Sequence, residues 1–187
     1  MGYKYYYLSY LFKQIKNRRK VIHKVIDKQH NSRMCFVCGM KNKYGLKASF
    51  YETDTNELVA IIKPGEEHQG YPGRLHGGIA AAVLDETIGR TITMGKEKEV
   101  WGVTVEFKIK YIKPIPLHDE IKVVAKLVED KRIFKGTGKI ILSNGEIAAE
   151  AEGIYLRLPI EKIADFDKEE NEWKVVKSQS DPVIIEF

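Results

Sequence analysis

The sequence has no long hydrophobic run, and its 187 residues include only two cysteines, Cys35 and Cys38. Because no apolar stretch approaches the roughly 20 residues that cross a bilayer as a helix, a membrane-spanning segment is not predicted. The tyrosine-rich stretch at residues 5–12 lacks a following small-residue cleavage site, so no signal peptide is expected. Two cysteines make no disulfide framework and suit a reducing compartment, so we expect a cytoplasmic protein.

Acidic residues are scarce at the N-terminus. Residues 1–33 contain nine lysines and arginines against a single acid, Asp27, which gives this segment a net charge of +8 in a chain whose total is +5. Since the remainder carries a net charge of −3, the positive charge belongs to an extension and not to the body of the protein. A function in binding nucleic acid is therefore not expected.

Residues 5–29 have the pattern of a basic amphipathic helix. Apolar side chains recur at spacings of three, four and seven residues: Leu8, Leu11, Phe12, Ile15, Ile22, Val25 and Ile26. Packing on its own domain or on a sister chain is favoured, and an arm that binds a membrane surface or a polyanion is the alternative. The pattern predicts a helical extension over residues 1–32, with at most weak contact to a membrane surface.

From Gly45 onward the hydrophobic pattern changes to a period of two. It predicts one helix and six strands, at residues 76–91 and at 46–52, 57–63, 100–113, 119–129, 132–142 and 146–158. In the strand at 100–113, alternation places Trp101, Val103, Val105, Phe107, Ile109 and Tyr111 on one face, and Thr104, Glu106, Lys108 and Lys110 on the other. Short links such as Ser143–Gly145 favour antiparallel neighbours. We expect an α+β fold over residues 33–160, with a curved antiparallel sheet around one central helix, and an irregular acidic tail at 161–187.

The predicted helix begins with His76, Gly77 and Gly78. Backbone N–H groups in the first turn of a helix lack partners within it, and the helix dipole is positive there. Glycine has no Cβ, so another molecule can approach such an N–H closely. The motif therefore fits a site that polarises a carbonyl oxygen, and it fits equally well a tight turn that requires glycine.

A stripe of small residues on the same helix carries a carboxylate. Gly78, Ala81, Ala82, Asp85 and Gly89 follow helical spacing. Asp85 is either a buried catalytic group or a solvated or capping acid, and Glu86, about 100° around the helix, competes for the catalytic role.

The spacing between the two motifs has a geometric consequence. Gly77 and Asp85 lie about 12 Å apart along a helix that rises about 1.5 Å per residue, whereas an acid or base must lie within about 3 Å of its reacting atom. The two residues of one chain cannot serve the same carbonyl. If both act, each site combines residues from two subunits of a two-fold dimer.

Four stretches, in order along the chain, resemble the hotdog-fold acyl-CoA thioesterases of the phenylacetate-degradation (PaaI-like) type: Cys35–Leu46, His68–Glu86, Val103–Pro116 and residues 145–156. The resemblance covers about residues 33–158. It implies a hotdog fold, a homodimer or a homotetramer built from two dimers, and hydrolysis of acyl-CoA thioesters to free acid and CoA without a cofactor or a metal. It also implies that Asp85 is the general base or nucleophile, that the Gly77 N–H polarises the carbonyl, and that Thr104 orients water.

Many members of that family carry Asn where Gly70 stands here. His68 or Gln69 is expected to substitute for it, and an acyl-CoA-binding regulatory module without catalysis is the alternative function. Lysine or arginine near the mouth of the site would bind the CoA phosphates, and His76 is interpreted as a residue that holds the loop. The predicted substrate-binding residues are His68, Gln69, His76, Gly78, Glu86, Arg90, Arg132 and Lys135.

The two cysteines are separated by two residues, as in half of a structural zinc site. His30 and His68 are the candidates for further ligands, and the sequence has no second cysteine pair. Packing in the protein interior is therefore favoured for Cys35 and Cys38 over metal binding or redox chemistry.

Overall fold

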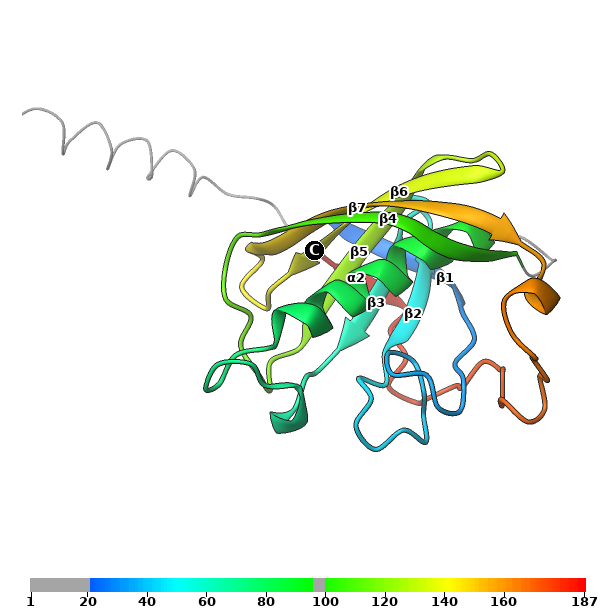
Figure 1. Cartoon of the computed structure of the whole chain (residues 1–187). Helices are drawn as coiled ribbons and strands as arrows, with labels where there is room; N and C mark the ends of the chain where they lie inside the picture. The colour runs from blue at the N-terminus through cyan, green and yellow to red at the C-terminus, as the bar shows by residue number, and fades with distance from the viewer. Residues whose placement is uncertain (1–20, 96–99) are drawn as a thin grey trace, which may run out of the picture.

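A computed structural model describes residues 21–95 and 100–187 (Figure 1). The strands are β1 (Ile22–Lys28), β2 (Ser49–Thr53), β3 (Leu58–Ile62), β4 (Trp101–Tyr111), β5 (Ile121–Glu129), β6 (Ile133–Ile141), β7 (Ile147–Leu158) and β8 (Ile184–Glu186). Helix α2 (Gly77–Arg90) accompanies them, with short 3-10 turns at Glu66–His68, Thr91–Thr93 and Ile160–Lys162. The strands form one eight-stranded sheet in the order β4-β7-β6-β5-β3-β2-β1-β8, and every pairing is antiparallel.

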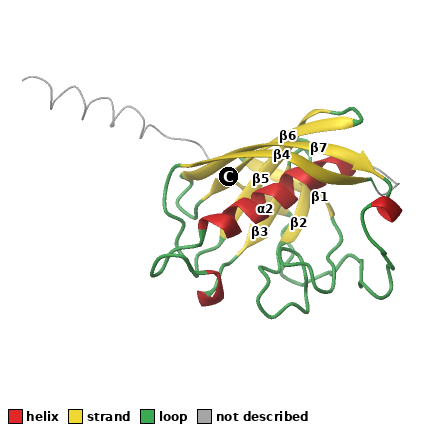
Figure 2. Cartoon of the chain, viewed as in Figure 1, coloured by secondary structure: helices red, strands yellow, loops and turns green. Residues whose placement is uncertain are grey.

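Helix α2 lies along one face of this sheet and contacts strands β3 to β7 (Figure 2). Its buried side chains recur at the spacing that places them on one side of a helix: Ala80, Val83, Leu84, Thr87 and Ile88. The apolar ones, all but Thr87, join Phe50, Phe134 and Ile121 in the main hydrophobic core. The predicted curved sheet around a central helix is confirmed, and within the described ranges no helix is long and apolar enough to cross a membrane.

A smaller hydrophobic cluster lies apart from the main core. It contains Tyr51, Val59, Val124, Ile141 and Ile185, the last of which belongs to β8. The central strands therefore bury side chains on both faces of the sheet, which explains the nearly continuous apolar sequence of β3.

The predicted N-terminal helix is not supported. Residues 22–28 of the predicted segment form strand β1, which pairs with β2 and β8, and residues 1–20 lie outside the described part. Ile22, Val25 and Ile26 match helical spacing, but they are β-branched and therefore suit a strand equally well. Their pairing with neighbouring strands, a tertiary effect, decides between the two.

The C-terminal segment packs against the sheet. In addition to β8, Asp181 accepts hydrogen bonds from Lys28 Nζ at 2.5 Å and from the Tyr51 hydroxyl at 2.8 Å. The His23 and Phe187 rings stack with centroids 3.9 Å apart. The sheet thus includes strands from both segments that flank residues 33–160, and the division of the chain at 32/33 and 160/161 stays a prediction.

Strand β4 departs from simple alternation. Its pairing with β7 shifts register between Thr104 and Glu106, which is a β-bulge. Phe107 and Ile109 pack against the core, yet Thr104 also reaches helix α2. The prediction that Thr104 lies on the face opposite Phe107 was wrong, because the extra residue in the bulge changes the phase of the strand.

Candidate active site

The N-terminus of α2 is held by its own first residues and by β4. His76 is the N-cap residue, and its Nδ1 accepts a hydrogen bond from the Gly78 N–H at 3.0 Å. The Tyr111 hydroxyl donates to the Gly77 carbonyl at 2.8 Å. Among residues 21–95 and 100–187, the Gly77 N–H has no hydrogen-bond acceptor. Within the described residues this N–H is therefore available to donate to a ligand, and its role in polarising a carbonyl stays a prediction.

Asp85, in the middle of α2, is held by two hydroxyl groups from the sheet. The Thr104 hydroxyl lies 3.0 Å from Asp85 Oδ1 and 3.2 Å from Oδ2. The Tyr155 hydroxyl lies 3.0 Å from Oδ1 and 3.0 Å from the Asp85 backbone carbonyl. The two hydroxyls fix the orientation of the carboxylate, which is partly buried.

Local features of β4 and β7 bring these hydroxyls to the helix. Thr104 and Tyr155 are directly paired across the two strands, next to the bulge. The Tyr155 side chain folds back over Gly153, where an added Cβ would lie 2.4 Å from the tyrosine hydroxyl oxygen. Its ring stacks on Phe134 with centroids 4.9 Å apart. Only glycine at position 153 leaves room for this arrangement.

Burial raises the pKa of Asp85, although the hydrogen bonds from Thr104 and Tyr155 act in the opposite direction. Burial also raises the pKa of the Tyr155 hydroxyl, and the nearby Asp85 carboxylate adds to that effect. Tyr155 therefore stays protonated and serves as a hydrogen-bond donor to the carboxylate.

Glu86 and Arg90 form a separate network. Arg90 Nη2 lies 2.8 Å from Glu86 Oε1, and Arg90 also donates to the His30 carbonyl at 2.9 Å. Its guanidinium lies over the rings of Phe50 and Trp173, with centroids 4.2 Å and 5.1 Å away. Because its donors are used inside the protein, Arg90 is poorly placed to bind a CoA phosphate.

A cavity of about 660 Å³ adjoins Asp85. Asp85, Thr104 and Tyr155 line it together with Cys35, Cys38 and Glu86, and the C-terminal segment contributes Phe166 and Trp173. The Trp101 ring lies 5.1 Å from Phe166 and 5.2 Å from Trp173, which makes an aromatic wall. The volume of the cavity is in the range typical of small-molecule sites, about 300–1,000 Å³.

Four other residues predicted to bind substrate do not line this cavity. His68 is 2% exposed, and its nitrogens lie 2.9 Å from the Gly65 N–H and 3.0 Å from the Tyr44 carbonyl, which leaves neither for a ligand. Gln69 accepts from the Gly73 N–H at 2.7 Å. Lys135 pairs with Glu129 at 2.9 Å on the surface. Neither Arg132 nor Lys135 lines the cavity.

Two tyrosines at the site were missed from the sequence. Tyr155 holds Asp85, and Tyr111 holds the carbonyl of Gly77. Alternation predicted both strands, but it carries no information about which helix residue a strand residue meets. Gly153, two residues before Tyr155, was the one available sign that a large side chain needs space there.

Comparison with known proteins agrees with the resemblance to thioesterases that the central segment of the sequence shows. Residues 72–132 match the sequence profile of the Thioesterase superfamily. The chain is 29% identical over 117 residues to the acyl-coenzyme A thioesterase THEM4 of Mus musculus, a match that covers 62% of this chain and 49% of that protein. The chain thus spans about half the length of the curated relatives that it matches first.

Solved structures share the fold. A thioesterase superfamily protein aligns with a TM-score of 0.61 at 20% identity, covering 82% of this chain and 75% of that one. The BH2602 protein of Bacillus halodurans, crystallised with CoA, aligns with a TM-score of 0.52 at 25% identity, covering 59% and 73%. These comparisons confirm the predicted resemblance to hotdog-fold thioesterases and the predicted hotdog fold.

Proposed function

We propose that this chain hydrolyses acyl-CoA thioesters to a free acid and CoA. The observation that carries the proposal is the Asp85 carboxylate, which two hydroxyls orient on the wall of a cavity large enough for a small molecule. The match of residues 72–132 to the Thioesterase superfamily supports the reaction. The CoA bound to the Bacillus halodurans protein supports the substrate class.

In the proposed reaction, Asp85 acts on the thioester carbonyl. As a general base it takes a proton from water, and the resulting hydroxide adds to the carbonyl carbon. The tetrahedral intermediate then collapses, the C–S bond breaks, and the CoA thiolate takes up the proton. Direct attack by the carboxylate, followed by hydrolysis of the mixed anhydride, gives the same products. The Thr104 and Tyr155 hydroxyls keep the carboxylate in position for either route.

The Gly77 N–H would stabilise the oxyanion, and it would come from a second subunit. Along α2, Gly77 and Asp85 are about 12 Å apart, which is too far for one thioester. Strand β4 is at the edge of the sheet and exposes 39% of Val103, 64% of Val105 and 53% of Tyr111. A long edge strand with exposed apolar side chains favours pairing with another chain. A two-fold dimer through β4 would create two equal sites.

The experiment is thiol release from a panel of acyl-CoAs of different chain length. Asp85→Asn is expected to lower kcat/KM by about 10²–10⁴-fold, the usual contribution of a general base. Asp119→Asn, the same change at an exposed position, is the control and should leave turnover unchanged. If Asp85→Asn retains wild-type turnover, Asp85 is neither base nor nucleophile.

A second candidate function is acyl-CoA binding without turnover. At position 70, where many family members carry Asn, an added Cβ would lie 3.0 Å from the His76 Cα, so the local packing is built for glycine. The same assay separates the two functions. A wild-type protein that binds acyl-CoA but releases no thiol at any chain length would be a binding module.

A further inference from the structure

Cys35 and Cys38 lie in a tight turn that directs hydrogen-bond donors at sulfur. Cys35 Sγ accepts from the N–H groups of Val37 and Cys38, at 3.3 Å and 3.4 Å. The Gly39 N–H closes the turn on the Cys35 carbonyl at 2.9 Å. A Cβ at position 39 would lie 2.3 Å from that carbonyl oxygen, so glycine is required here. Donors of this kind stabilise a metal-bound thiolate.

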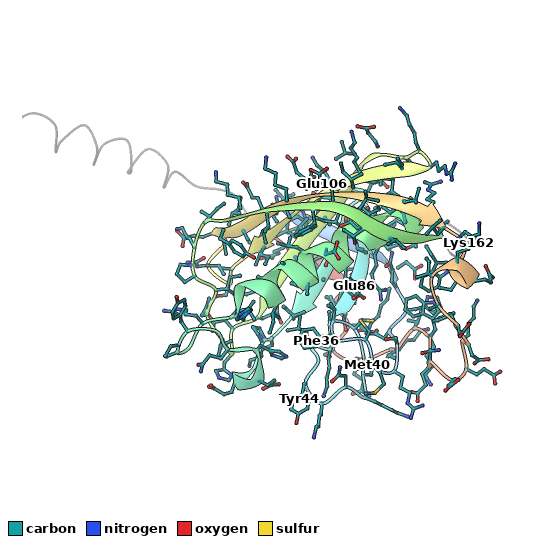
Figure 3. All side chains as sticks on the ribbon, in the orientation of Figure 1. Phe36, Met40, Tyr44, Glu86, Glu106 and Lys162 are labelled. Atoms are coloured by element: carbon teal, nitrogen blue, oxygen red, sulfur yellow. The ribbon has the colours of Figure 1, made fainter. Side chains whose placement is uncertain are left out.

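Helix α2 adds a third donor atom to this pair. The Glu86 carboxylate oxygen Oε2 lies 3.2 Å from Cys35 Sγ, and all three ligand atoms lie within 4.8 Å of one another. Figure 3 shows Glu86 on the helix beside the loop that carries Phe36 and Met40. A tetrahedral zinc ion, with Zn–S about 2.3 Å and Zn–O about 2.0–2.2 Å, holds such ligands about 3.5–3.8 Å apart. Small side-chain adjustments would therefore complete the geometry.

The charges around the cluster also favour a divalent cation. As ligands, two thiolates and one carboxylate carry three negative charges. Arg90 supplies one positive charge, with Nη2 at 3.2 Å from Cys38 Sγ and 2.8 Å from Glu86 Oε1. Arg90 thereby orients Cys38 and Glu86 from outside the cluster, and the second carboxylate oxygen, Glu86 Oε2, faces Cys35 Sγ. Cys38 is only 1% exposed, and uncompensated charge at such depth is costly. A doubly charged ion would balance the remaining two charges.

We propose that Cys35, Cys38 and Glu86 bind one Zn²⁺ ion. Thiolate ligands select zinc over magnesium and calcium. All three side chains line the cavity, so its solvent can supply the fourth ligand as a water molecule. Binding releases the protons of the two thiols to solvent as the two Zn–S bonds form.

The ion would tie the loop at residues 31–46 to α2. Asp85 directly precedes Glu86 in the helix, but its carboxylate is turned to Thr104 and Tyr155. The zinc site is thus distinct from the thioester site and stabilises one wall of the same cavity. A disulfide between the cysteines is the competing interpretation, but it uses neither Glu86 nor the charge of Arg90.

Metal binding is tested on the full-length protein, stripped of metal under reducing conditions and titrated with Zn²⁺ by calorimetry and with Co²⁺ by absorption. We expect one equivalent of each ion to bind. The Co²⁺ form should show a thiolate-to-metal charge-transfer band and the strong visible bands of a tetrahedral site. Each loss of a ligand should weaken zinc binding more than the loss of a residue that only hydrogen-bonds to a ligand, which costs about 10–100-fold. The variants are Cys35→Ser, Cys38→Ser and Glu86→Gln. Glu150→Gln, at an exposed strand position, should bind as the wild type does.

Three outcomes would overturn the proposal: no stoichiometric zinc in the wild type, a Co²⁺ spectrum without the thiolate band, or wild-type affinity in Glu86→Gln. Formation of a Cys35–Cys38 disulfide by a protein that never holds zinc would show a redox pair instead. The Co²⁺ spectrum is read on the wild type, so a variant that fails to fold does not affect it. Zinc binding is measured without acyl-CoA, so this result is independent of the proposed hydrolase function.

Discussion

Replacement of Gly77 by alanine separates catalysis from folding. An added Cβ at this position would lie 3.5 Å from the Tyr111 ring, an ordinary contact, so the fold should accept it. Alanine is a better helix former than glycine by about 1 kcal/mol, and the free energy of unfolding should change by no more than that. The new methyl group, however, stands beside the N–H that we propose as the oxyanion donor.

The expected loss of activity follows from the contribution of one such donor. Loss of one oxyanion donor costs about 2.7–4 kcal/mol of transition-state stabilisation, or about 10²–10³-fold in kcat. We expect Gly77→Ala to approach this loss while its melting temperature stays within about 4 °C of the wild type. The assays are thiol release with a preferred acyl-CoA and thermal unfolding by circular dichroism. Full activity in a folded Gly77→Ala protein would refute the role of this N–H.

Three further substitutions test the support of the site. Thr104→Val removes the hydroxyl that donates to Asp85 and should lower kcat about tenfold or more, whereas Thr104→Ser keeps a hydroxyl and should keep the wild-type kcat. Equal kcat in both variants would rule out a role for the hydroxyl. Leu84→Ala truncates a fully buried side chain of α2 and should lower the free energy of unfolding by about 2–5 kcal/mol in urea denaturation. A loss below about 1 kcal/mol would mean that the core is looser than described. Trp173→Ala removes the ring over Arg90 and part of the aromatic cavity wall, so KM for acyl-CoAs with bulky acyl groups should rise more than KM for acetyl-CoA; an equal change for both would place the acyl group elsewhere.

The elements with long, regular hydrophobic periods were predictable from the sequence. Helix α2 and strands β4 to β7 lie within two residues of their predicted bounds, because apolar residues recur with a regular period through each of them. Strand β1 was not predictable, since Ile22, Val25 and Ile26 satisfy helical spacing as well. The pairing of β1 with β2 and β8, far away in the sequence, decides its structure.

The contacts of the candidate site were harder to predict than its residues. Asp85 and Gly77 stand out by their motif, whereas the bulge that turns Thr104 toward Asp85 leaves no trace in an alternating pattern. Glu86 likewise meets Cys35 only because α2 crosses the loop after β1. Such contacts between distant segments are set by the tertiary fold, which spacing along one segment does not encode.

We propose that each thioester site combines Gly77 of one subunit with Asp85 of another, and mixed dimers are the most direct test of this shared site. Asp85→Asn and Gly77→Ala subunits, each nearly inactive alone, would be unfolded together in equal amounts and refolded. A shared site predicts recovery to about one quarter of wild-type activity, because half of the dimers are mixed and each mixed dimer regains one intact site of two. Activity that stays at the level of the separate variants would contradict a shared site, because no site within a single chain gains both groups on mixing.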